Sequence, residues 1–186
     1  MGLRGKNMAA GPTYDCLAVT TISSTSDTFI TLNNISQSYT DLVVICNMFW
    51  SDQDITYIRF NNDSGTNYST QHLVVDVTDI VTSDSTTNQN AGFLGRFGTN
   101  VANSPFTATP FSFGTQIIHV NNYKNTGSFK SALCRNSNYS RPPYGVGISA
   151  VLWKSTSAIS RIDLVGGGGT YIMPGSTVKL YGIAEA

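Results

Sequence analysis

The fold class follows from the stretch Tyr57-Ile58-Arg59-Phe60-Asn61-Asn62-Asp63-Ser64-Gly65-Thr66-Asn67-Tyr68-Ser69. It reads as a strand, then a polar turn, then the aromatic residue Tyr68, where the chain re-enters the fold. From Ile55 to Phe60 successive side chains point to opposite faces, and the run then meets Asn, Asp, Ser and Gly, which favour turns. None of these residues is arranged in a way typical of catalysis. The stretch therefore predicts the surface of a β-sandwich rather than an active site.

Similar segments recur along the chain at the spacing of a sandwich or jelly roll. We expect an all-β fold, an antiparallel, jelly-roll-like β-sandwich of about ten strands. The runs Leu42-Val43-Val44-Ile45-Cys46 and Ile117-Ile118-His119-Val120 predict central strands that are covered on both faces. The expected strands are residues 15–22, 28–32, 41–49, 55–60, 71–77, 116–123, 129–135, 146–153, 159–165 and 177–183.

The length of 186 residues suits one domain, which we place at residues 14–186. Residues 1–13 are too poor in apolar side chains to join a core and predict an N-terminal arm, in which Met8 is an alternative start. Residues 82–110 predict a long irregular loop that could include a short strand near residues 92–97. Gly166-Gly167-Gly168-Gly169 predicts a hairpin tip.

Composition excludes several classes of function. Charged residues make up only 12% of the chain, and the eleven basic and eleven acidic residues balance. Because no basic patch is present, we expect no nucleic-acid partner, and because no apolar run has transmembrane length, we expect no membrane partner. Cys16, Cys46 and Cys134 have no spacing typical of disulfides or zinc, so we expect reduced, mostly buried thiols in a cytoplasmic setting.

Motifs that could carry chemistry are weak. Gly92-Phe93-Leu94-Gly95-Arg96-Phe97-Gly98 lacks the strand and helix that a phosphate-binding loop needs. His72 and His119 lie inside strand patterns without metal ligands beside them, and no serine lies in a nucleophile elbow. We therefore expect no catalytic residue, no metal, no cofactor and no enzyme.

One loop leaves an alternative open. Asp52 and Asp54 stand beside Trp50 and Tyr57, and such a group could bind a sugar through aromatic stacking. The other interpretation is a polar turn between two strands, which is the more common role of such residues.

Four segments together resemble small virion structural proteins of tailed bacteriophages, and the similarity covers almost all of the chain after the arm. These segments are Tyr39-Thr40-Asp41-Leu42-Val43-Val44, the opening stretch from Tyr57 to Ser69, Trp153-Lys154-Ser155-Thr156-Ser157-Ala158-Ile159, and Gly175-Ser176-Thr177-Val178-Lys179-Leu180-Tyr181-Gly182-Ile183. The motifs are structural rather than catalytic, so they indicate a module more clearly than its role.

The resemblance implies a non-enzymatic virion protein, assembled in the host cytoplasm, with two alternative roles. The first is a capsid decoration (cement) protein on the outer capsid surface, a homotrimer that binds the major capsid protein. The second is a tail or fibre module that binds host surface glycan through Trp50, Asp52, Asp54 and Tyr57. Under the first role, the residues expected to contact the capsid or a neighbouring subunit are Arg4, Lys6, Phe106, Phe111 and Phe113.

Overall fold

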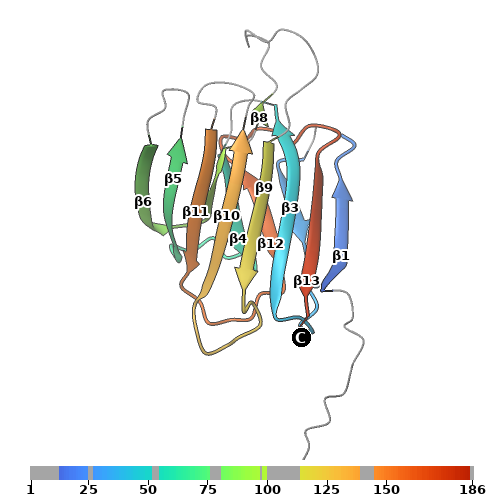
Figure 1. Ribbon diagram of the computed structural model, residues 1–186, viewed down its shortest axis with the longest axis vertical. Coiled ribbons are helices and arrows are strands. Elements are labelled where there is room, and N and C mark those ends of the chain that lie inside the picture. Colours follow the sequence, from blue (N-terminus) through green and yellow to red (C-terminus); the bar gives the residue numbers. More distant parts are fainter. Residues whose placement is uncertain are drawn as a thin grey trace, which may run out of the picture.

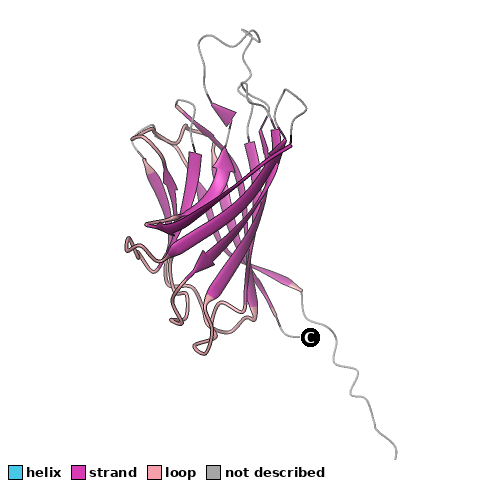
Figure 2. Ribbon diagram, turned by 90° about the vertical axis from the view of Figure 1, so that its left-hand side faces the viewer, coloured by secondary structure: helices cyan, strands magenta, loops and turns pink. Residues whose placement is uncertain are grey.

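The computed structural model describes residues 13–24, 27–51, 55–75, 81–96, 98–99, 114–138 and 145–184. These residues form thirteen strands and no helix, and the strands lie in two facing sheets (Figures 1 and 2). The prediction of an all-β sandwich is therefore confirmed. The strands are β1 (Tyr14–Thr21), β2 (Phe29–Leu32), β3 (Asp41–Trp50), β4 (Ile55–Phe60), β5 (Tyr68–Val75), β6 (Val81–Gln89), β7 (Gly92–Arg96), β8 (Gly98–Thr99), β9 (Gly114–Asn121), β10 (Lys130–Asn138), β11 (Gly145–Trp153), β12 (Ile162–Gly166) and β13 (Thr177–Ile183).

Strand pairing is nested around the middle of the chain. The larger sheet has the order β1-β13-β3-β9-β10-β11-β5-β6, with β8 beside β3, and the smaller sheet has the order β2-β12-β4-β7. Four antiparallel pairs of strands alternate between the two sheets. They are β1 with β13, β2 with β12, β3 with β9, and β4 with β7. Strands β10, β11, β5 and β6 extend the larger sheet beyond this nested set (Figure 1).

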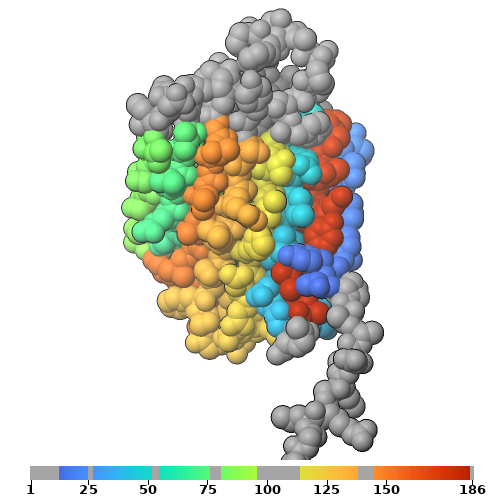
Figure 3. All heavy atoms as spheres, in the orientation of Figure 1, coloured from blue at the N-terminus to red at the C-terminus, as the bar shows by residue number. Residues whose placement is uncertain are grey.

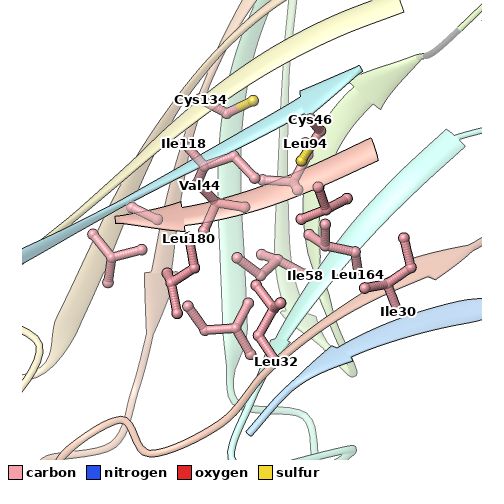
Figure 4. Close-up of a cluster of buried hydrophobic side chains, with 14 of the residues drawn as sticks. Ile30, Leu32, Val44, Cys46, Ile58, Leu94, Ile118, Cys134, Leu164 and Leu180 are labelled. Atoms are coloured by element: carbon pink, nitrogen blue, oxygen red, sulfur yellow. The ribbon is translucent and has the colours of Figure 1, made fainter. Parts of the chain in front are cut away.

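The two sheets bury one hydrophobic core between them. Val44 and Ile118 come from the larger sheet, Ile58 and Leu164 come from the smaller sheet, and all four are fully buried. Figure 4 shows these side chains meeting between the ribbons of the two sheets. Apolar surface removed from water in this way is the main favourable contribution to folding.

The two strands predicted to be central lie side by side in the larger sheet. In β3, Leu42 and Val44 point inward and are fully buried, whereas on the other face Val43 is buried and Ile45 is only half-buried, so the prediction of coverage on both faces holds only in part. In β9, by contrast, burial alternates, and Ile117 and His119 are only half-buried. The prediction for β9 is wrong because its second face lies on the outer side of the larger sheet.

The stretch from Tyr57 to Ser69 carries the chain from the smaller sheet to the larger one. Asn61 and Asn62 follow β4 with φ angles of 53° and 57°, in the left-handed region that Asn adopts more readily than most residues. The backbone N–H of Phe60 donates to Oη of Tyr68 over 2.8 Å. This hydrogen bond joins the end of β4 to the start of β5, so the turn fixes the two sheets relative to each other.

Asp63 organises the same turn through three hydrogen bonds. Its carboxylate accepts from the backbone N–H of Gly65 at 2.8 Å, from Nδ2 of Asn67 at 2.9 Å and from Nε1 of Trp153 at 2.7 Å. Burial raises the pKa of Asp63, but the hydrogen bonds from Trp153, Asn67 and Gly65 outweigh burial and hold this pKa below its ordinary value of 3.8. The ionised carboxylate is therefore the form that stabilises the turn.

We expect the Asp63→Asn variant to lose part of the acid sensitivity of the wild-type chain. Because the pKa of Asp63 is lower in the folded state, its contribution to stability is present above the unfolded value and is lost as pH falls through the folded value. Urea unfolding between neutral pH and about pH 3 measures this difference. Asp27→Asn, at an exposed carboxyl, is the control. Equal loss of stability on acidification in wild type and Asp63→Asn would contradict the assignment.

Two sequence predictions about connections are wrong. Residues 82–89 of the expected irregular loop lie in β6, which pairs with β5 along its length. In the same region β7, at residues 92–96, agrees with the short strand expected near residues 92–97. The run from Gly166 to Gly169 is not a hairpin tip, since β12 lies in the smaller sheet and β13 in the larger one. Gly168 and Gly169 adopt φ angles of 67° and 78° in this connection, which glycine permits without steric cost.

The three cysteines are free, and two of them are buried as predicted. Cys46 and Cys134 lie in the core, where burial raises the pKa of Cys46 well above its ordinary value and that of Cys134 to about 12. Cys16 is exposed because it lies on β1, at the edge of the larger sheet.

Candidate interaction surface

The outer face of the larger sheet is the most unusual surface of the described part of the chain. In β11, Ser149, Val151 and Trp153 point inward and are buried, so the alternate residues point outward. Those outward residues are Val146, Ile148, Ala150 and Leu152, and all four are exposed. A strand on the surface of a monomer usually carries polar residues at such positions, whereas this one is apolar on both faces.

The pairing register places further apolar side chains beside those of β11. Ile148 lies opposite Leu73 of β5, and Ala150 lies opposite Leu133 of β10. Val146 lies opposite Val75, which in turn lies opposite Val81 of β6. We define the outer apolar patch by its six large exposed side chains, which are between 37% and 59% exposed: Leu73, Val81, Leu133, Val146, Ile148 and Leu152.

The patch spans four neighbouring strands, and Arg135 separates it from further apolar side chains on β9 and β3. These are half-buried Ile117 of β9 and Ile45 of β3, which lie side by side. Figure 3 shows this side of the molecule, with the side chains of β5, β11, β10 and β9 in adjacent green, orange and yellow bands. Contiguous apolar surface of this kind marks an interaction site in most soluble proteins.

Charged groups on this face are few and lie at defined positions. Arg135 of β10 lies in the row of Ile148 and Ile117, and its Nη2 is 3.4 Å from Nε2 of His119. Lys179 of β13 lies opposite Ile45 in the same row. The only ion pair among the described residues joins Arg161 to Asp163 at 2.9 Å on the smaller sheet. Within the described part of the chain, Arg135 and Lys179 therefore have no carboxylate partner.

The register also brings Ser149, His72 and Asp84 into line across β11, β5 and β6. These residue types form catalytic triads when hydrogen bonds join them. Here Ser149 is only 1% exposed, and Nδ1 of His72 is buried without a hydrogen-bond partner among the described residues. The ring of His72 packs instead on Phe93, with centroids 4.6 Å apart. The line of residues therefore lacks the geometry of a nucleophile and its base.

The residues predicted as functional fall into two groups. Seven of them lie outside the described residues: Arg4, Lys6, Asp52, Asp54, Phe106, Phe111 and Phe113. Of the two that are described, Tyr57 is half-buried and packs edge-on against Phe93, with ring centroids 6.1 Å apart. Trp50 is 0% exposed, and its Nε1 donates to Oγ1 of Thr56 over 3.2 Å. The hypothesis that Trp50 stacks on a sugar is therefore corrected, because no face of its indole reaches the surface.

Neither a metal site nor a membrane-spanning helix is found among the described residues. No group of three or more His, Cys, Asp or Glu side chains there could hold a metal ion. The same residues include no helix with the length and apolar character needed to cross a membrane.

No protein-family model matches the sequence, and no curated protein matches it.

Sequence reasoning did not predict the outer apolar patch, although a signal for it was present. Val146-Gly147-Ile148-Ser149-Ala150-Val151-Leu152-Trp153 has apolar residues at both even and odd positions. This pattern is typical of a strand covered on both faces, and the structure covers only one face.

Proposed function

We propose that the chain is a non-enzymatic structural subunit of a bacteriophage virion, and specifically a decoration protein on the outside of the capsid. The single observation that carries the proposal is the outer apolar patch, six large apolar side chains exposed on one face of a rigid sheet. A surface of this kind suits a protein that works within an assembly, where another protein covers it. The resemblance of the sequence to virion structural proteins supports the same assignment.

The strand order supports a jelly-roll assignment for the sandwich. In a jelly roll, the chain folds as a long hairpin whose strand pairs alternate between two sheets, and viral capsid and lectin domains use this architecture. The nested pairs β1–β13, β2–β12, β3–β9 and β4–β7 follow that scheme. Because folds host many functions, this argument concerns the architecture, and the exposed patch carries the functional part.

The proposed mechanism is stabilisation of the capsid by binding. A subunit that binds the assembled lattice of the major capsid protein, but not its dissociated form, shifts the equilibrium toward the lattice by mass action. The low charge of the chain suits this role, because balanced charges give little electrostatic repulsion between copies that lie close together on a shell.

Capsid shells that lack the protein provide the direct test. We expect the purified chain to sediment with such shells in a saturable manner and to raise the temperature at which filled particles release their genome. Shells already saturated with the wild-type chain are the control, since they should take up no more. Absence of binding together with an unchanged release temperature would overturn the decoration role.

A further inference from the structure

We infer that the open edge of β6 binds an extended segment of another polypeptide as an added strand, and that Asp84 selects a segment with Lys or Arg opposite it. β6 is the last strand in the order of the larger sheet, so one of its edges has no neighbour among the described strands (Figure 1). In strand addition, backbone hydrogen bonds supply affinity and side chains supply specificity. The inference goes beyond the proposed function, because it concerns a sheet edge and not the outer apolar patch.

The other edges of the two sheets are short or irregular, which hinders pairing with a further chain. β1, at the opposite end of the larger sheet, has a bulge between Cys16 and Ala18. In the smaller sheet the edge strands are β2, with four residues, and β7, with five residues and an interrupted pairing to β4. β6 differs, since its residues 81–86 pair with β5 in one uninterrupted register. It therefore offers the longest regular edge of the described strands.

The side chains of β6 do little to block a further strand. The strand contains no Pro, Lys or Arg, which are the residues that commonly protect a sheet edge. Eight of its nine residues are exposed, so β6 buries little and is held in place by its backbone pairing with β5. A strand on the second edge would pair with the backbone groups that β5 does not reach.

One backbone group of β6 is occupied by the side chain beside it. The N–H of Ser85 donates to Oδ1 of Asp84 over 2.7 Å, so this amide is one that the pairing with β5 leaves over. Because the N–H groups of a strand alternate between its two edges, the N–H of Ser83 points the same way. Asp84 forms no ion pair with any described residue. A Lys or Arg on an arriving strand would attract the Asp84 carboxylate and free the N–H of Ser85 for pairing, whereas an acidic residue there would meet like charge.

The two faces of β6 define the rest of the segment. On the outer face, Val81 belongs to the outer apolar patch, so an apolar residue beside it would continue that patch. On the other face, Asp84 stands between Thr82 and Thr86, where small β-branched residues suit the positions around the basic one. The partner is therefore a segment that alternates apolar and polar residues, with Lys or Arg among the polar ones. The same edge of a second copy does not meet this requirement, because β6 has no basic residue of its own.

Binding of synthetic strands to the purified full-length chain tests the inference. The probe is a fluorescein-labelled nine-residue peptide that alternates Thr and Val and carries Lys in place of the central Thr. We expect a saturable rise in fluorescence anisotropy, and an affinity about tenfold lower when Glu replaces the central Lys. Two N-methylated peptides, blocked at odd or at even amides, separate backbone pairing from side-chain contact. Only alternate amides face β6, so one of these peptides should lose binding and the other should keep it.

A charge reversal in the protein completes the test. Asp84→Lys should bind the Glu peptide more tightly than the Lys peptide. The matched control is Asp27→Lys, which makes the same change of charge at an exposed residue before β2 and should keep the wild-type preference. Both variants alter exposed side chains, and thermal unfolding checks that each is folded.

Four results would overturn the inference. The first is no binding of the Lys peptide, and the second is equal affinity of the wild-type chain for the Lys and Glu peptides. The third is equal binding of the two N-methylated peptides. The fourth is self-association of the chain that excludes the peptide, which would assign the edge to a second copy.

Discussion

Trp50→Ala is expected to lower the free energy of unfolding by about 3–5 kcal/mol, the usual range for removing a fully buried large aromatic side chain. Trp50 is the last residue of β3 in the larger sheet, and its indole donates a hydrogen bond to Thr56 of β4 in the smaller sheet. Thr56 is itself fully buried, so the variant also leaves a buried hydroxyl without this donor. Urea unfolding followed by tryptophan fluorescence, which Trp153 still reports, measures the change.

The matched control for Trp50→Ala is Tyr57→Ala, a second aromatic residue of the same hypothetical sugar site. Tyr57 is half-buried, so we expect a smaller loss of stability than at Trp50. A loss below about 1 kcal/mol at Trp50 would contradict its position in the core. The burial of Trp50 also decides how a glycan-binding experiment with Trp50→Ala is interpreted. Loss of binding in Trp50→Ala would report a damaged fold rather than a missing sugar contact.

Gly166→Ala is expected to destabilise the fold by about 1–3 kcal/mol through overpacking. A Cβ atom on Gly166 would lie 2.5 Å from Cζ3 and 2.8 Å from Cη2 of Trp50, which is closer than carbon atoms approach. Gly166 is the last residue of β12, and the ring of Trp50 is enclosed, so neither side can move away freely. The matched control is Gly127→Ala, because an added Cβ there meets no atom closer than 3.4 Å.

A double-mutant cycle with Trp50→Leu tests the cause of the Gly166 effect. Removing the large ring should relieve the clash, so Gly166→Ala should cost less in the Trp50→Leu background than in the wild type. Residues in direct contact typically show coupling of about 0.5–3 kcal/mol in such cycles. Additive effects of the two substitutions would show that the cost of Gly166→Ala arises elsewhere.

Apolar alternation predicted the strands of the sandwich well. Residues 55–60 and 177–183 are strands with the predicted bounds, because each alternates inward and outward side chains with few exceptions. Strand β6 was missed since Thr82-Ser83-Asp84-Ser85-Thr86-Thr87-Asn88-Gln89 buries almost nothing and so carries no alternation. It forms because its backbone pairs with the edge of β5, and backbone pairing leaves little trace in side-chain pattern.

Prediction of functional residues was harder, for a physical reason. Alternation identifies the two faces of a strand, but it does not say which of them another layer will cover. β11 illustrates this limit, because its apolar residues at even positions are as prominent as those at odd positions, and only Ser149, Val151 and Trp153 reach the core. Trp50 illustrates the opposite case. Its polar neighbours in sequence suggested an exposed ring, while the end of β3 turns that ring inward against Gly166.

The number of copies in the virion tests the central claim most directly. If the proposed function is correct, the chain is part of a phage particle, and quantitative mass spectrometry of purified particles would measure its amount relative to the major capsid protein. The proposed decoration role predicts about one copy per major capsid subunit, because sites repeated on the lattice fill when the free protein exceeds its Kd. A ratio near one to a hundred, roughly what a tail or fibre with few attachment sites would give, or absence from the particle, would contradict it.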